Sequence, residues 1–125
     1  MIHLDTSVLI DALAGQRRSA PALREAIANG ERLAMSALVL SEWLRGPRRE
    51  DELHVQSQLL PPPDAVPFDH RAAEKAAALY RQVKRPRGRE IDLAIAACAI
   101  CQGASLWTLN EQVFNDIPGL ELYRP

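Results

Sequence analysis

The sequence has few cysteines, lysines and aromatic residues, and it contains no long apolar run. Two cysteines cannot form a disulfide framework, so the composition favours the cytoplasm. No run approaches the roughly 18 apolar residues that indicate a membrane span, and the first residues lack the basic segment of a secretory signal. With 125 residues, 47% of them hydrophobic, we expect one domain over residues 1–125 and no membrane contact.

Motifs of several common enzyme classes are also missing. The three histidines and two cysteines do not have the spacing of a zinc site. Neither GxxxxGK[ST] nor GxGxxG is present to bind nucleotide phosphates, and no GxSxG marks a serine hydrolase. Cys98 and Cys101 match CxxC in letters but lie inside an apolar helix pattern, where buried structural thiols are expected. Trp43 and Trp107 are likewise expected in the core.

Apolar patterns and helix end signals predict short strands that alternate with helices. Strands are expected at residues 2–4, 33–35, 65–68, 104–107 and 120–123. Helices are expected at residues 7–14, 22–29, 37–45, 48–60 (an exposed helix), 71–84 and 91–102. This order predicts an α/β fold with a mainly parallel sheet of four to five short strands. In such sheets, functional residues gather outside the carboxyl ends of the strands.

Two acids stand at predicted strand-to-helix junctions. Asp5 closes the first strand, and although aspartate is a good helix cap, Thr6 and Ser7 offer the same service. Asp92 opens the apolar helix at 91–102, where an acid in the first turn also favours the helix dipole. Each acid therefore has a local explanation and a functional one.

A third acid, Glu42, lies in the nearly all-apolar helix at 37–45. Burial there would be costly unless the carboxylate is paired or bound to metal; the alternative is an edge position paired with Arg45. Because Asp5, Glu42 and Asp92 all follow strands at one predicted edge, their charges would repel one another. A hard divalent cation such as Mg²⁺ resolves this repulsion, which indicates metal-assisted phosphodiester hydrolysis.

The densest positive charge directly precedes Asp92. With a net charge of −1 the chain is not a strongly basic nucleic-acid binder, but a local basic patch remains compatible with RNA binding. The alternative is a solvated loop. The candidate RNA-contacting residues are Arg81, Lys84, Arg85, Arg87 and Arg89.

Four blocks of sequence resemble the PIN-domain family, and specifically the VapC-type toxin ribonucleases. They are residues 1–10 (MIHLDTSVLI), 36–46 (SALVLSEWLRG), 91–97 (IDLAIAA) and 106–110 (LWTLN), the last followed by 117–120 (IPGL). Each block alone is a weak signal. Together they occur in the family's order and cover residues 1 to about 123.

The resemblance implies a three-layer α/β/α PIN-like fold and a Mg²⁺- or Mn²⁺-dependent endoribonuclease. It also implies a toxin that is usually a homodimer and is inhibited by a cognate antitoxin, with tRNA or another structured RNA as substrate. The family's metal-binding acids correspond to Asp5, Glu42 and Asp92. Its Thr-x-Asn element corresponds to Thr108 and Asn110.

The chain departs from the family pattern at one position. The family commonly has a fourth acid three residues after the asparagine, where this chain has Val113. Glu111 or Asp116 are candidates to compensate, and Glu90 is a candidate from the other side of the site. Without compensation a two-metal mechanism is weakened, and a three-acid, one-metal version remains.

The sequence therefore supports two hypotheses. In the first, Asp5 and Asp92 bind the metal, Glu42 binds it or orients the attacking water, and Asn110 or Thr108 holds the water or the phosphate. The alternative is a non-catalytic PIN-fold module that binds RNA or protein. A phosphatase or phosphoacceptor domain is disfavoured, because Ser7 stands where such a phosphatase needs an aspartate, and both lysines fall in one predicted helix.

Overall fold

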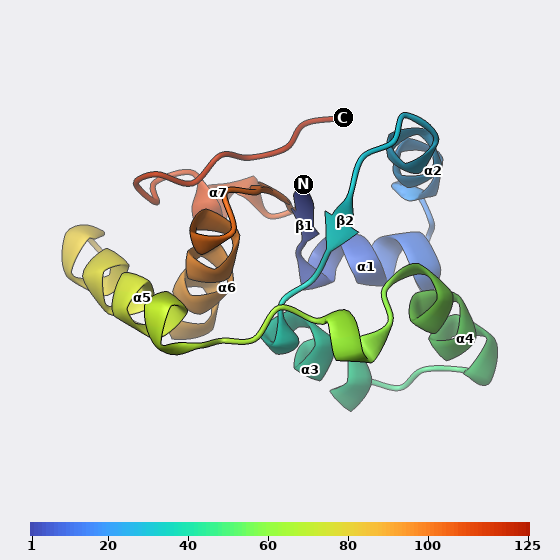
Figure 1. Ribbon diagram of the computed structural model, residues 1–125, viewed down its shortest axis with the longest axis horizontal. Helices are drawn as coiled ribbons and strands as arrows, with labels where there is room; N and C mark the ends of the chain where they lie inside the picture. Colours follow the sequence, from blue (N-terminus) through green and yellow to red (C-terminus); the bar gives the residue numbers. More distant parts are fainter.

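The computed structural model describes residues 1–125, and its elements alternate along the chain (Figure 1). The strands are β1 (Ile2–Leu4), β2 (Leu33–Ala34) and β3 (Ser105–Trp107). The helices are α1 (Thr6–Leu13), α2 (Ala20–Ala28), α3 (Ala37–Arg45), α4 (Glu50–Leu59), α5 (His70–Gln82), α6 (Glu90–Cys101) and α7 (Glu111–Phe114), with a 3₁₀ turn at Pro62–Asp64.

The strands form one parallel sheet in the order β2-β1-β3, which confirms the predicted α/β class. His3 of β1 lies opposite Ala34 of β2 and Leu106 of β3. The two further strands expected at 65–68 and 120–123 are reduced to single parallel bridges, Ser36 with Val66 and Leu106 with Leu122. The sheet therefore has three strands rather than four to five. For the strand expected at 65–68, Pro67 explains the loss, because proline has no N–H to continue the hydrogen-bond ladder beyond Val66.

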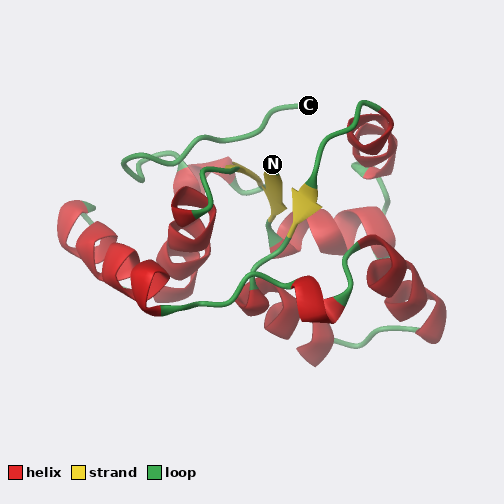
Figure 2. Cartoon of the chain, viewed as in Figure 1, coloured by secondary structure: helices red, strands yellow, loops and turns green.

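Helices lie on both sides of the short strands. Figure 1 shows α5 and α6 packed side by side on one side, with α1, α2 and α4 grouped on the other. Figure 2 shows how small the sheet is beside the helices. A cluster of 22 buried hydrophobic residues fills the interior. None of the helices combines the length and apolar character that a membrane crossing needs.

Local end signals set the helix boundaries. α3 spans the predicted residues, and the Ser36 hydroxyl accepts a hydrogen bond from the Val39 N–H at 3.2 Å. α5 begins after Asp69, whose carboxylate accepts from the Ala72 N–H at 2.9 Å. The short helix α7 was not predicted, because four residues are too few for a recognisable period.

The apolar helix α6 is buried on all sides along residues 93–99. A helix that is apolar all round must be enclosed, and here α3, α5, α7 and β3 pack against it. Burial raises the pKa of the Cys98 thiol to about 11. Cys98 and Cys101 are both free; Cys98 is buried as predicted, whereas Cys101 is partly exposed.

The corner between α3 and α4 is held by the fully buried Trp43. Its indole N–H donates to the Gln56 side-chain oxygen at 3.2 Å, and the Gln56 amide donates to the Leu60 carbonyl at 2.9 Å. The Arg48 guanidinium lies 4.2 Å from the centre of the indole ring and donates to the Trp43 carbonyl. α4, which was predicted as an exposed helix, therefore has a buried polar side chain, Gln56. Gln56 is buried because the indole N–H of Trp43 needs a hydrogen-bond partner in the core.

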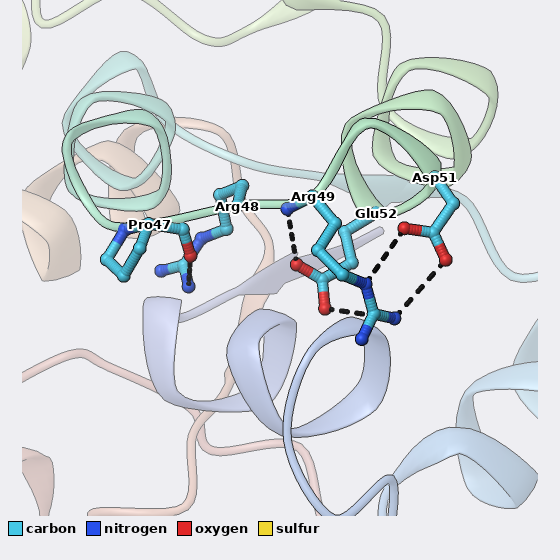
Figure 3. Close-up of polar contacts among 5 residues, drawn as sticks. All are labelled: Pro47, Arg48, Arg49, Asp51 and Glu52. Atoms are coloured by element: carbon cyan, nitrogen blue, oxygen red, sulfur yellow. Dashed lines mark hydrogen bonds and ion pairs between the residues drawn. The ribbon is translucent and has the colours of Figure 1, made fainter.

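The start of α4 is fixed by charged side chains (Figure 3). The Glu52 carboxylate, only 7% exposed, accepts from the Arg49 backbone N–H at 2.9 Å. The Arg49 guanidinium lies between the carboxylates of Asp51 and Glu52. The Arg49–Asp51 pair is largely exposed and contributes little, whereas the Glu52 contact satisfies a backbone donor at the helix start.

His3 is an unpaired polar residue in the core. It is 1% exposed, and neither ring nitrogen has a hydrogen-bond partner. Burial, with a smaller contribution from the N-terminal ammonium, lowers the pKa of His3 from 6.5 to about 4. The folded protein therefore keeps this imidazole neutral at a pH where the unfolded chain protonates it.

We expect the free energy of unfolding to fall by about 3 kcal/mol between pH 6.5 and pH 4 because of His3. The stabilisation is complete above pH 6.5, the unfolded pKa, and is lost as the pH falls toward the folded pKa of about 4. Urea unfolding across this range measures it. His3→Leu should flatten the decline, whereas His54→Leu, at an exposed histidine of α4, should not. An equal decline in the His3 variant would contradict the assignment.

Candidate active site

Asp5 lies where β1 ends and α1 begins, and its side chain does not cap the helix. The residue is 5% exposed, and its backbone N–H donates to the Trp107 carbonyl at 2.9 Å, which ties it to β3. Its Oδ2 atom accepts hydrogen bonds from the hydroxyls of Ser7, at 2.9 Å, and Thr108, at 2.8 Å. The expectation that α1 does not need Asp5 as a side-chain cap is confirmed, and Oδ1 has no protein partner.

The two hydroxyls beside Asp5 are themselves oriented by the backbone. Ser7 Oγ accepts from the Leu109 N–H, and Thr108 Oγ1 accepts from the Asn110 N–H, each at 3.0 Å. Because each hydroxyl has a single proton, accepting these bonds leaves that proton to point at Asp5. The loop after β3 is thereby fastened to the start of α1, and the Thr108 hydroxyl has no proton left to donate to another group.

Glu42 reaches the same edge from α3. Its Oε1 atom accepts from the Thr6 hydroxyl at 2.6 Å, and Oε2 lies 3.6 Å from Nη2 of Arg45. The side chain is 26% exposed, so the edge position and the Arg45 pair that the sequence left open are both observed. Sequence reasoning treated Thr6 and Ser7 only as caps. The signal for their role was two hydroxyl residues directly after an acid that ends a strand.

Asp92 lies in the first turn of α6 and is partly buried. The prediction of a strand-to-helix junction at Asp92 is wrong, because α6 follows α5 through a loop. Its carboxylate makes no hydrogen bond and no ion pair. Burial raises the pKa of Asp92, and the negative charges of Asp5 and Glu42 raise it further, while the Arg89 guanidinium acts in the opposite direction. The three predicted acids therefore share one electrostatic environment, although they come from three separate elements.

The donor set at this edge fits a hard cation. Only oxygen atoms are available, from three carboxylates and the adjacent hydroxyls, and Asp5 Oδ1 and both Asp92 oxygens have no protein partner. No three His, Cys, Asp or Glu side chains close into a compact ligand group. Mg²⁺ takes oxygen ligands and usually retains several waters, so it needs only one or two of these carboxylates as direct ligands.

The sequence model of the PIN-domain family matches residues 2–120. The chain belongs to the PIN-domain family. It is 31% identical to ribonuclease VapC19 of Mycobacterium tuberculosis over 124 residues, covering 94% of this chain and 95% of that protein. It is 34% identical to ribonuclease VapC1 of Methanocaldococcus jannaschii over 130 residues, covering 98% and 86%.

The fold of this chain is also similar to that of solved VapBC structures. The crystal structure of VapBC2 from Rickettsia felis, bound to a DNA fragment from its promoter, matches with a TM-score of 0.79. The identity is 25%, and the match covers 98% of both chains. The DNA-bound VapBC structure from Salmonella typhimurium also has a TM-score of 0.79, and at 21% identity it supports the fold alone.

This PIN domain uses Asp116 as an ion-pair partner. The Arg89 guanidinium donates to Asp116 Oδ2 at 3.0 Å and to Oδ1 at 2.5 Å, and also to the Val113 carbonyl at 2.7 Å. This contact holds the pKa of Asp116 below its usual value. Both Asp116 oxygens accept hydrogen bonds from Arg89, so neither is a free metal ligand that could replace the acid missing at Val113.

The other two candidate acids of this PIN domain make contacts with other groups. Glu111 pairs with Arg124 at 2.8 Å. Glu90 is exposed, accepts only a long hydrogen bond of 3.4 Å from the Gly88 N–H, and is not among the charges that act on Asp92. Its side chain lines a cavity on the α5 side of α6 instead.

The basic cluster divides into two parts. Arg89 is only 18% exposed, and its guanidinium is committed to Asp116 and to backbone carbonyls, so it serves the fold. The other four side chains are exposed and form no ion pair; they are Arg81, Lys84, Arg85 and Arg87. The side chain of Asn110 is likewise exposed and makes no hydrogen bond, beside the Asp5–Thr108 contact.

Proposed function

We propose that this PIN domain is a metal-dependent endoribonuclease and the toxin of a toxin–antitoxin pair, acting in the cytoplasm on tRNA or another structured RNA. The observation that carries the proposal is a group of acids in which Asp5 Oδ1 and both Asp92 oxygens have no protein partner, with Asp5 and Glu42 near enough to raise the pKa of Asp92. A bound cation would offset the effect of the Asp5 and Glu42 charges on the Asp92 carboxylate. Relatives named ribonucleases support the choice of substrate.

Asp5 and Asp92 hold the metal in this proposal, because they have the oxygens without protein partners. Glu42, fixed by Thr6, either joins them or orients the attacking water. When bound, Mg²⁺ or Mn²⁺ lowers the pKa of water and stabilises charge on the phosphate. Ser7 and Thr108 position Asp5, because each hydroxyl donates its only proton to the Asp5 carboxylate. The side-chain amide of Asn110 still has free N–H groups, so in this proposal it donates to the water or the phosphate.

The test is incubation of the purified chain with a pool of tRNA and structured RNA in Mg²⁺, Mn²⁺ or EDTA. We expect cleavage in either metal and none in EDTA. Because a ligand that binds the folded state stabilises it, the metal should also raise the melting temperature. Cleavage that persists in EDTA would refute the metal-dependent mechanism, whatever the RNA.

A non-catalytic RNA- or protein-binding PIN domain is the second candidate. Val113 favours it, because Glu111 and Asp116 are both engaged in other ion pairs and supply no fourth acid. This alternative predicts RNA binding without turnover and no increase in melting temperature with Mg²⁺ or Mn²⁺. The same assay therefore separates the two functions.

The proposed partners are an antitoxin and a second copy of the chain. An apolar groove of about 480 Å³ between α1, α2 and α4 exposes Ile27 and Val55 at 44% and 47%, with Arg17 and Arg24 among its lining residues. Such a groove suits an apolar antitoxin segment that carries acidic residues. The native mass of the chain alone and with its antitoxin measures both associations.

A further inference from the structure

A second cavity lies between α5 and the first turn of α6. Its volume of about 370 Å³ falls at the low end of ligand pockets, which span roughly 300–1,000 Å³. Three small or apolar side chains line it together with a phenol, a guanidinium and a carboxylate. The lining residues are Ala76, Ala77, Leu93, Tyr80, Arg81 and Glu90.

The three functional groups of this cavity are not used by the fold. Tyr80 is 38% exposed, and its hydroxyl makes no hydrogen bond. Arg81 is exposed and forms no ion pair, even though Glu90 lines the same cavity. Glu90 keeps Oε1 free and accepts only the 3.4 Å contact from Gly88 at Oε2. These groups are available to a ligand, whereas nearby Arg89 is committed to Asp116.

The cavity adjoins the candidate active site through the start of α6. Glu90 and Asp92 are two residues apart in its first turn, so their Cα atoms lie about 5 Å apart and their side chains leave opposite sides of the helix. Ile91, between them, is 50% exposed. A strand of RNA that crosses Ile91 can thus present a phosphate on the Asp92 side and a base on the Glu90 side.

We propose that this cavity binds an unpaired guanine of the RNA substrate beside the scissile phosphate, an inference that rests on the proposed nuclease function. Tyr80 stacks on the base, as aromatic side chains do with unpaired bases in RNA. Arg81 contacts the neighbouring phosphate. The Glu90 carboxylate accepts hydrogen bonds from the Watson–Crick edge.

The carboxylate of Glu90 is what selects guanine. Guanine presents two adjacent donors, N1–H and the exocyclic amine, which match two carboxylate oxygens. Adenine and cytosine place a ring acceptor next to their amine, which repels a carboxylate, and uracil offers a single N–H between two carbonyls. A base without the matching donors leaves a charged acceptor unpaired, and such a mismatch is strongly disfavoured.

The test uses unstructured RNAs in which one guanine interrupts a run of uridines, beside counterparts with adenine, cytosine or inosine at that position. We expect the wild type with Mg²⁺ to cleave the guanine RNA about tenfold faster than the others. Inosine, which lacks the exocyclic amine, isolates one of the two hydrogen bonds. Fluorescence anisotropy with the same RNAs in EDTA measures binding without cleavage.

Variants separate the roles of the two side chains. Glu90→Gln should abolish the preference for guanine, whereas Glu74→Gln, at an exposed glutamate of α5, should retain it. Tyr80→Leu should weaken binding about tenfold for every base, and Tyr80→Phe should restore it, because stacking needs the ring and not the hydroxyl.

Each outcome bears on one proposal. Cleavage or binding without a preference for guanine, or an unchanged preference in Glu90→Gln, would overturn the base-binding role and leave the nuclease intact. Guanine-selective binding together with no metal-dependent cleavage of the tRNA and structured-RNA pool would support the cavity and overturn the nuclease. The anisotropy measurement keeps the cavity testable even when no RNA is cleaved.

Discussion

Replacing Asp5 by asparagine is expected to lower RNA cleavage by about 10³-fold or more while the fold is retained. A metal ligand contributes several kcal/mol of transition-state stabilisation, and each 1.4 kcal/mol or so is a factor of ten in rate. Asparagine keeps an oxygen that can accept from Ser7 and Thr108, so the contacts between α1 and the loop after β3 persist. What is lost is the charge that attracts the cation.

The measurement is initial cleavage rate with Mg²⁺, beside circular dichroism and melting temperature. Asp64→Asn is the matched control, because Asp64 is exposed in the 3₁₀ turn and makes no ion pair. The Asp5 variant should also lose the increase in melting temperature with metal. If it kept more than a tenth of the wild-type rate, Asp5 would not be a metal ligand, and the site would have to be reassigned.

Replacing Trp43 by alanine is expected to lower the free energy of unfolding by about 3–5 kcal/mol, which is typical for loss of a large buried aromatic side chain. Trp43 is fully buried, and its removal also leaves the Gln56 side-chain oxygen without its donor. Since small domains have a total stability of roughly 5–15 kcal/mol, the variant should be close to unfolded under mild denaturing conditions.

Urea unfolding measures this loss from the shift in midpoint at constant slope. Leu44→Ala is the matched control on the same helix, because Leu44 is 50% exposed and should cost little. Trp43→Phe should fall between the two, since it keeps most of the packing but leaves Gln56 unpaired. A loss below about 1 kcal/mol in Trp43→Ala would show that this corner does not hold α3, and hence Glu42, in place.

The Trp43 corner and the Asp5 site depend on the same helix. Glu42 and Trp43 are neighbours on α3, with the indole in the core and the carboxylate at the carboxyl edge of the sheet. Packing of the Trp43 indole in the core therefore sets the direction in which the Glu42 side chain leaves α3. This is why we expect partly folded Trp43 variants to lose cleavage earlier than they lose helix content.

Much of the fold was predictable because its signals are local. Ser36 and Gly46 bound α3 at the predicted residues, and α5, capped by Asp69, begins at His70, one residue before its predicted start. The strands at the sheet edges were less predictable. Whether residues 65–68 continue a ladder depends on a neighbouring strand and on Pro67, and not on their own β propensity.

The strand rule applies to two of the three candidate acids. Asp5 follows β1 and Glu42 lies in the helix after β2, so a parallel sheet predicts that these two meet at one edge. The same rule does not account for Asp92, because α6 follows α5 and a loop, with no strand between them. The other charged residues could not be sorted in this way. Arg89 and Asp116 are 27 positions apart, and nothing local indicates that they pair.

The sequence by itself determined the six longer helices, the three strands that form the sheet, the parallel α/β class and the family. Only the tertiary structure decided how the remaining polar groups are used: Arg89 and Asp116 for the fold, Thr6, Ser7 and Thr108 as hydroxyl partners of the acids, and Glu90 for a separate cavity. The physical reason is range. Helix caps and apolar periods act over a few residues, whereas hydrogen bonds and ion pairs join whichever groups the packed chain brings within about 3 Å.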